Sequence, residues 1–176
     1  MTNDGPPRGV LVAAVIVAAS AVIGVLVYAA IRQRPPQELP VPIASVEAPA
    51  ADGSTCRALL ASLPDQLGDY QRAKLADPAP AGAAAWRSNP DEEPVVLRCG
   101  LEAPADFIAG APIQVVDEVS WFRVGDQGRS TWFTVDRPAY VALTLPDGSG
   151  PTPIQLISAA VTKAMPAIPV NPAPVR

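Results

Sequence analysis

The chain has 176 residues, with 13 lysine or arginine residues against 17 aspartate or glutamate residues and a formal net charge of −4 at pH 7. Such an acidic chain lacks the basic surface that nucleic acids require, so no nucleic-acid partner is expected. Histidine is absent and only two cysteines occur, which removes the usual transition-metal ligands and the usual base of a hydrolytic triad. We therefore expect no metal, no other cofactor and no catalytic residue.

Residues 10–31 form an apolar run without a charged side chain. As a helix this run would extend about 33 Å, enough to cross the hydrocarbon core of a bilayer. The run is also longer than the apolar region of a signal peptide, which has about 7 to 15 residues. We predict a short N-terminal tail over residues 1–9 and a single-pass transmembrane anchor over residues 10–31, which places the protein in the cell membrane.

The orientation of this anchor follows from two opposing signals. Arg32 and Arg34 slightly favour a cytoplasmic position for the rest of the chain, because positive flanks tend to stay inside. The cysteine pair favours an oxidising compartment, and long domains are translocated despite a weak charge bias. We predict that the C-terminal domain is extracytoplasmic.

Composition divides the remainder into three parts. Residues 32–53 are rich in proline and show no helical or alternating pattern, which predicts an extended spacer. Residues 54–166 are long enough for one small domain. Residues 167–176 are again proline-rich and predict a loose tail.

The domain begins and ends with a predicted helix. Residues 56–63 place their leucines on one face, and Pro64 ends the segment. Thr152 and Pro153 suit the start of a second helix, whose apolar side chains recur at helical spacing as far as Met165.

Four strands are predicted between these helices. Residues 67–85 are rich in alanine and proline without a strong period and are predicted as loop or weak helix. The β-branched and aromatic runs that follow predict strands at residues 95–101, 115–124, 130–136 and 140–145. The predicted fold class is α+β: a small antiparallel sheet of about four strands flanked by an N-terminal and a C-terminal helix, preceded by the transmembrane helix.

Cys56 and Cys99 are predicted to form a disulfide, because an even number of cysteines outside the cytoplasm indicates pairing. The alternative is a redox-active pair. Such pairs usually have C-x-x-C spacing, which these cysteines lack.

Two tryptophans suggest a binding surface. The glycines at residues 125–128 predict a tight hairpin that sets Trp121 opposite Trp132, with Arg123 and Thr134 on the same face. This face is a possible stacking platform for a sugar or a peptide. The alternative is that the tryptophans lie under a helix or a loop, as tryptophans more often do. The opposite face, with the phenylalanines of both strands, is the more uniformly apolar candidate for the core.

The acidic residues do not form a convincing site. Residues 91–93 are acidic but lack the ligand spacing of a Ca²⁺ loop, so they predict a solvated turn. Asp117 and Glu118 are neighbours in a predicted strand and would point to opposite faces, which excludes a shared role in acid–base catalysis.

Several motifs together resemble a known family. They are the segment Cys56–Pro64, Ala84–Trp86, Val96–Gly100, Trp121 and Arg137–Val141. Over roughly residues 55–165 the chain is similar to the actinobacterial envelope family known as domain of unknown function 3515. The resemblance implies a membrane-associated or secreted protein and supplies no catalytic residues.

Two functions remain open from the sequence. The first is a membrane-tethered, extracytoplasmic and non-enzymatic domain that binds or scaffolds a cell-envelope protein or glycan. The second is a hydrolase or transferase that acts on cell-wall material through carboxylates. A cleft with two facing carboxylates would favour the second.

Overall fold

The computed structural model describes residues 8–32, 39–126 and 128–175. The chain divides into two compact units, Met1–Gln37 and Glu38–Arg176. Residues 1–7 of the predicted tail and residues 33–38 of the predicted spacer lie outside the described residues.

The first unit contains helix α1 (Arg8–Arg32). Within the described residues, no helix combines the length and the apolar character needed to cross a membrane. This finding corrects the predicted transmembrane anchor over residues 10–31.

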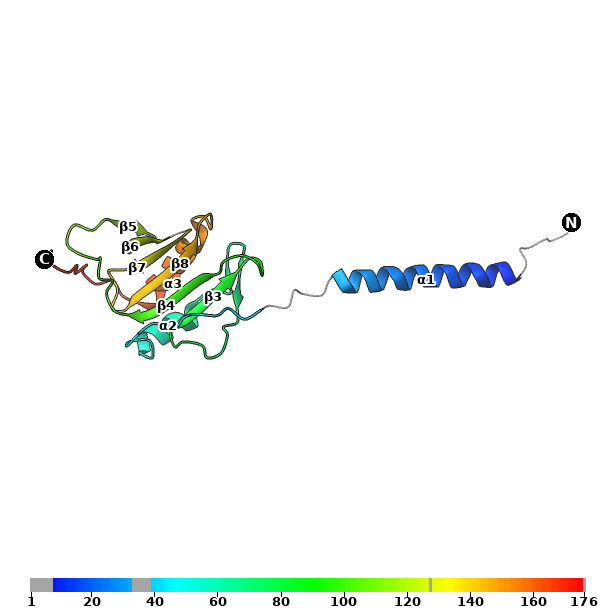
Figure 1. The fold of residues 1–176 in the computed structure, drawn as a ribbon, viewed down its shortest axis with the longest axis horizontal. Coiled ribbons are helices and arrows are strands. Elements are labelled where there is room, and N and C mark those ends of the chain that lie inside the picture. The colour runs from blue at the N-terminus through cyan, green and yellow to red at the C-terminus, as the bar shows by residue number, and fades with distance from the viewer. Residues whose placement is uncertain (1–7, 33–38, 127, 176) are drawn as a thin grey trace. The chain divides into compact units, whose positions relative to one another are not determined.

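The second unit is an antiparallel sheet with two helices (Figure 1). Its strands follow the spatial order β1-β2-β3-β4-β8-β7-β6-β5, so β4 and β8 pair in the middle of the sheet. The helices are α2 (Ser54–Ser62) and α3 (Thr152–Ala164), and the strands are β1 (Gln66–Leu67), β2 (Tyr70–Ala73), β3 (Ala83–Arg87), β4 (Val95–Leu101), β5 (Ile113–Val116), β6 (Val119–Asp126), β7 (Arg129–Thr134) and β8 (Tyr140–Pro146).

The sheet therefore has eight strands, and the prediction of about four was wrong. Three of the missing strands, β1, β2 and β3, lie within or overlap the alanine-rich region 67–85, where intrinsic β-propensity is low. Strand pairing and burial determine the conformation of β3 instead. Its residues Ala84, Ala85 and Trp86 are buried, and β3 pairs with β2 and β4.

The fourth missing strand arises because the predicted strand 115–124 is a hairpin. Asp117 has φ 45° and Glu118 has φ 67°, so the chain reverses there between β5 and β6. Both carboxylates consequently lie in an exposed turn and not on opposite faces of one strand.

The register of the β6–β7 hairpin also differs from the prediction. Trp121 pairs with Thr134, and Arg123 pairs with Trp132. Each residue of β6 pairs with a β7 residue two positions further along the chain than expected, and the last pair is Asp126 with Arg129. A shift by two residues leaves side chains on the same face, so the four predicted platform residues still share a face.

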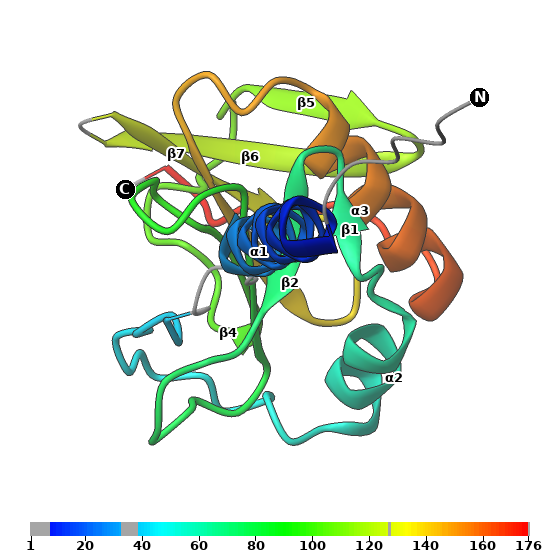
Figure 2. The same cartoon turned by 90° about the vertical axis from the view of Figure 1, so that its right-hand side faces the viewer.

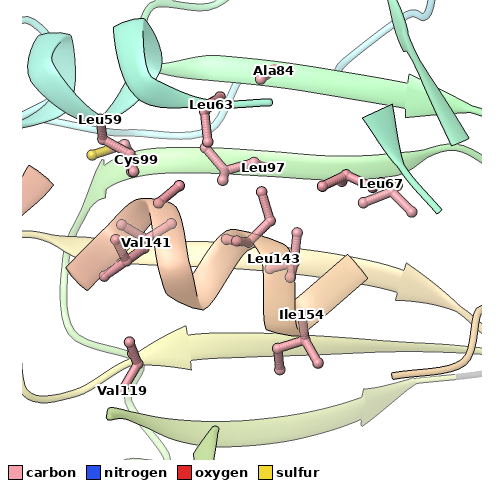
Figure 3. Packing of buried hydrophobic residues seen from close by; sticks show 14 of the residues in the cluster. Leu59, Leu63, Leu67, Ala84, Leu97, Cys99, Val119, Val141, Leu143 and Ile154 are labelled. Carbon is pink, nitrogen blue, oxygen red and sulfur yellow. The ribbon is translucent and has the colours of Figure 1, made fainter. Parts of the chain in front are cut away.

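That face carries the main hydrophobic core. Helices α2 and α3 both pack on it, and Figure 3 shows Leu59 and Leu63 from the α2 region and Ile154 from α3 gathered over Leu97 and Leu143 of the central strands. The predicted helical stripe of α3 is buried throughout.

The opposite face of the sheet, here called the outer face, has a smaller core. Phe107, Phe122 and Val135 are buried there, with the rings of Phe107 and Phe122 5.3 Å apart. The expectation that the phenylalanine face forms the principal core was wrong. The tryptophan face was not predicted as the core because it carries polar groups. These groups form hydrogen bonds inside the core: the buried Trp121 Nε1 donates to Ser158 Oγ of α3 at 3.0 Å.

Both proline-rich segments lie against the domain. Val41 is buried and pairs with Leu75 in a short parallel bridge, so residues 39–53 form a strap along the sheet. At the other end Ala173 pairs with Ile108, and its N–H donates to the carbonyl of Phe107 at 3.1 Å. From Leu39 onward, the predicted spacer thus packs on the domain, as does much of the predicted loose tail.

The predicted disulfide is present. Cys56 of α2 is bonded to Cys99 of β4 across a sequence separation of 43, with the Cα atoms 5.6 Å apart. Both cysteines are fully buried, so the bond ties the first helix of the domain to its central strand.

Replacing Cys56 and Cys99 together by alanine should lower the free energy of unfolding by about 4 kcal/mol, because closing a loop of this length restricts the unfolded chain. Denaturant unfolding of the oxidised protein and the double variant, compared at one pH, measures the difference. Equal unfolding midpoints with equal slopes would contradict the structural role of the bond.

Candidate functional site

The predicted platform is divided by the fold. Trp121 and Thr134 are 0 % exposed, so α3 and the core leave neither accessible to a ligand. Trp132 is half-buried and Arg123 is exposed, with its guanidinium 5.6 Å from the centre of the Trp132 ring. Arg123 Nη2 also donates to Ser130 Oγ at 2.6 Å. The part of the predicted platform that remains at the surface is therefore the cation–π pair of Arg123 and Trp132, in which Arg123 is already hydrogen-bonded to Ser130.

The outer face contains a hollow that is partly lined by polar and charged residues. It encloses about 460 Å³ between the strap and the middle strands of the sheet, and we call it the outer groove. The residues that line it are Pro42, Ile43, Ala44, Glu93, Pro94, Val96, Arg98, Arg129, Thr131 and Thr144. Two cations and one carboxylate give this lining a positive balance in a chain whose net charge is −4.

The floor of the outer groove is one row of the sheet. Val96 pairs with Thr144, and Thr144 pairs with Thr131, so three adjacent strands contribute one side chain each. The hydroxyl oxygens of Thr131 and Thr144 are 3.0 Å apart and hydrogen-bonded. One of the two hydroxyls donates to the other, and the pair keeps further donor and acceptor capacity for a ligand.

Arg98 is a groove cation that is hydrogen-bonded to the strap. Its Nη2 donates to the carbonyl of Ala44 at 3.3 Å, a long bond, and its Nε is buried without a hydrogen-bond partner among the described residues. Burial lowers the pKa of the Arg98 guanidinium, although arginine remains protonated. A partly desolvated positive charge is favourable for binding an anion.

The strap forms the second wall of the groove through several anchors. Val41 N–H donates to Lys74 O at 2.8 Å, and Arg87 Nη1 donates to Leu39 O at 3.1 Å. Ala50 N–H donates to Gly100 O at 3.1 Å. The groove therefore forms only when residues far apart in the sequence meet. The sequence holds one weak indication of it. Arg98 lies between the buried Leu97 and Cys99, and this alternation directs the Arg98 side chain to the other face of the sheet.

A second hollow adjoins the groove and shares Glu93 with it. It encloses about 270 Å³ and is lined by Tyr70, Glu92, Glu93, Gly128, Pro146 and Asp147. The side chains of Ser88 and Asn89 donate hydrogen bonds to the Glu92 carboxylate, and these bonds lower the pKa of Glu92, the Ser88 bond having the larger effect. Desolvation, together with the charges of Glu92 and Asp69, raises the pKa of Tyr70. Within the described residues, no cluster of three or more His, Cys, Asp or Glu side chains is arranged to hold a metal ion.

A buried ion pair stabilises the opposite end of the sheet. Arg137 Nη1 lies 2.9 Å from Asp136 Oδ1, with 2 % and 11 % of the two side chains exposed. Arg137 Nη2 donates to Glu118 O at 2.8 Å, and Asp136 Oδ2 accepts from Ser120 N–H at 2.9 Å. The pair thus connects the β7–β8 loop to the β5–β6 turn, and we assign it a structural role.

Replacing Arg137 by methionine should lower the free energy of unfolding by about 3–5 kcal/mol, because Asp136 would be left charged and buried without its partner. The matched control is Arg129→Met, an exposed arginine whose loss should change stability by about 0.5 kcal/mol or less. Equal, small effects of the two substitutions in denaturant unfolding would show that the ion pair does not stabilise the fold.

Comparisons with known proteins give one positive result. No curated protein matches the chain, and no solved structure matches it. One family model matches residues 15–170, which include both cysteines, the strands of the outer groove and the Asp136–Arg137 pair. Because this match covers most of the 176 residues, the chain belongs to the family described as protein of unknown function DUF3515.

Proposed function

We propose that the chain is a non-enzymatic, extracytoplasmic domain that binds or scaffolds a cell-envelope partner, and that the outer groove takes an anionic group of that partner. The observation that carries the proposal is the groove itself: Arg98 and Arg129 flank a hydroxyl-bearing floor, and the strap closes one side. Arginine and threonine side chains at such a site suit a carboxylate or a phosphate.

The disulfide supports the extracytoplasmic part of the proposal. Disulfides persist in oxidising compartments and are rare in a reducing cytoplasm. The bond between Cys56 and Cys99 is fully buried and joins two separate elements, which is typical of a permanent structural disulfide.

The carboxylate-dependent hydrolase or transferase is the second candidate, and the hollow around Glu92, Glu93 and Asp147 is the observation relevant to it. A general acid at neutral pH needs a raised carboxyl pKa. The pKa of Glu92 is shifted downward, because Ser88 and Asn89 donate to its carboxylate. Glu92 is therefore unsuited to the role of general acid.

Partner binding can be tested by cross-linking from inside the groove. A photo-reactive amino acid at Thr131 of the full chain, in the cells that make it, should give a discrete adduct, whereas the same group at Gln155, exposed on α3 over the opposite face, should not. Adding Arg98→Ala should reduce the Thr131 adduct about tenfold, since a charged hydrogen bond contributes about 1.5–3 kcal/mol. Equal adducts from both positions, or an adduct insensitive to Arg98→Ala, would contradict the proposal.

Location can be tested separately. A reporter enzyme that is active only outside the cytoplasm, fused after Arg176, should be active in the native host. The same fusion with a cytoplasm-only reporter serves as the control and should be inactive. Activity of the cytoplasmic reporter alone would overturn the extracytoplasmic assignment while leaving the cross-linking result to stand independently.

A further inference from the structure

Strand β5 forms one edge of the sheet. It is the last strand in the spatial order and pairs with β6 on one side (Figure 2). An edge strand presents main-chain N–H and C=O groups that can pair with another strand. Which of its groups point outward follows from the register.

Val115 lies opposite Ser120 in the β5–β6 ladder. The carbonyl of Ser120 accepts from Val135 N–H at 2.9 Å, and its N–H donates to Asp136 Oδ2 at 2.9 Å. Both main-chain groups of Ser120 thus face the β7 side, so the Val115–Ser120 pair is not hydrogen-bonded. In an antiparallel ladder the main-chain groups of Val115 then point to the open edge, as do those of Ile113 two residues earlier.

The side chains of these two residues are also exposed. Val115 is 70 % exposed and Ile113 is 39 % exposed, and both project from the outer face. Proteins usually protect an edge with a proline or a charged residue within the strand. Strand β5 has the sequence Ile-Gln-Val-Val and carries neither.

We propose that β5 pairs with β5 of a second copy of this chain, antiparallel and about a two-fold axis at Gln114. The rotation places Ile113 opposite Val115 of the second copy, and Val115 opposite Ile113. Each of these pairs can exchange two main-chain hydrogen bonds, so the contact supplies four. The two sheets would continue into one another through β-branched side chains, which are favourable cross-strand neighbours.

The sequence of β5 favours a second copy over an unrelated strand. A symmetric contact requires a self-complementary surface, and the rotation exchanges two β-branched apolar residues whose main-chain groups both point to the open edge. It also moves the acidic Asp117–Glu118 turns to opposite ends of the contact, beside the uncharged residues 110–111 of the other copy. Like charges therefore do not meet.

The contact is short, since β5 has 4 residues. Interfaces well below about 1,200 Å² are typical of weak and transient complexes. We accordingly expect a reversible dimer whose population rises with protein concentration. This association is independent of ligand binding in the outer groove.

The full-length chain with Gln114→Cys tests the arrangement directly. The axis places the two Gln114 residues opposite each other with Cα atoms about 4.5 Å apart, within the range of a disulfide. The variant should form a covalent dimer under mild oxidation. Gln155→Cys, exposed on α3, is the matched control and should stay monomeric.

Sedimentation velocity over a concentration series gives the second readout. Val115→Pro removes an N–H that points away from β6 and should weaken association at least about tenfold. Val115→Thr keeps that N–H and should associate like the parent. If Val115→Pro does not fold, Val115→Lys replaces it, because an edge lysine also opposes strand pairing. A chain that stays monomeric at every concentration, or equal cross-linking of the two cysteine variants, would overturn the proposal and leave the edge to a foreign strand.

Discussion

The close contact between residues 50–56 and the end of β4 determines how the N-terminal side of the domain is built. Gly100 has φ +89°, and a Cβ at this position would lie 2.3 Å from the nitrogen of Ala51, so only glycine permits the approach. One residue earlier, Cys99 is bonded to Cys56 of α2. The strap and α2 therefore both take their positions from one end of a central strand.

The outer groove depends on this contact. Its second wall is the strap, which is fixed at one end by Val41 beside Leu75 and at the other by Ala50 hydrogen-bonded to Gly100. Between these anchors the Arg98 guanidinium reaches the carbonyl of Ala44. The position of the Arg98 cation and the shape of the groove thus both depend on the contact between the strap and the end of β4.

Elements with local signals could be predicted from the sequence. Strand β4 spans the predicted residues 95–101, and α3 buries the predicted apolar stripe, because spacing and bounding prolines specify both. The disulfide followed from cysteine count and is present. Strand β3 could not be predicted, since its alanines are weak strand formers and only burial between β2 and β4 decides their conformation.

The candidate site was harder to predict for two physical reasons. The tryptophan face looked accessible because it carries polar residues, yet Thr134 accepts from Val141 N–H at 2.9 Å and Trp121 donates to Ser158, so this polarity is satisfied in the core. The outer groove joins the strap to β4, β7 and β8, and no local pattern in the sequence indicates that meeting. Only the alternation around Arg98 pointed to a cation on the outer face.

The central claim is that the strap lies fixed on the sheet and shapes the groove. Hydrogen exchange at the Ala50 amide of the oxidised full-length chain tests it most directly, because this N–H is bonded to Gly100 O at 3.1 Å. We predict exchange at least about tenfold slower than in an unstructured peptide, and loss of that protection in Gly100→Ala. Gly148→Ala, where a Cβ meets nothing within 4 Å, should retain it. Exchange of the Ala50 amide at the unprotected rate in the parent protein would contradict the account.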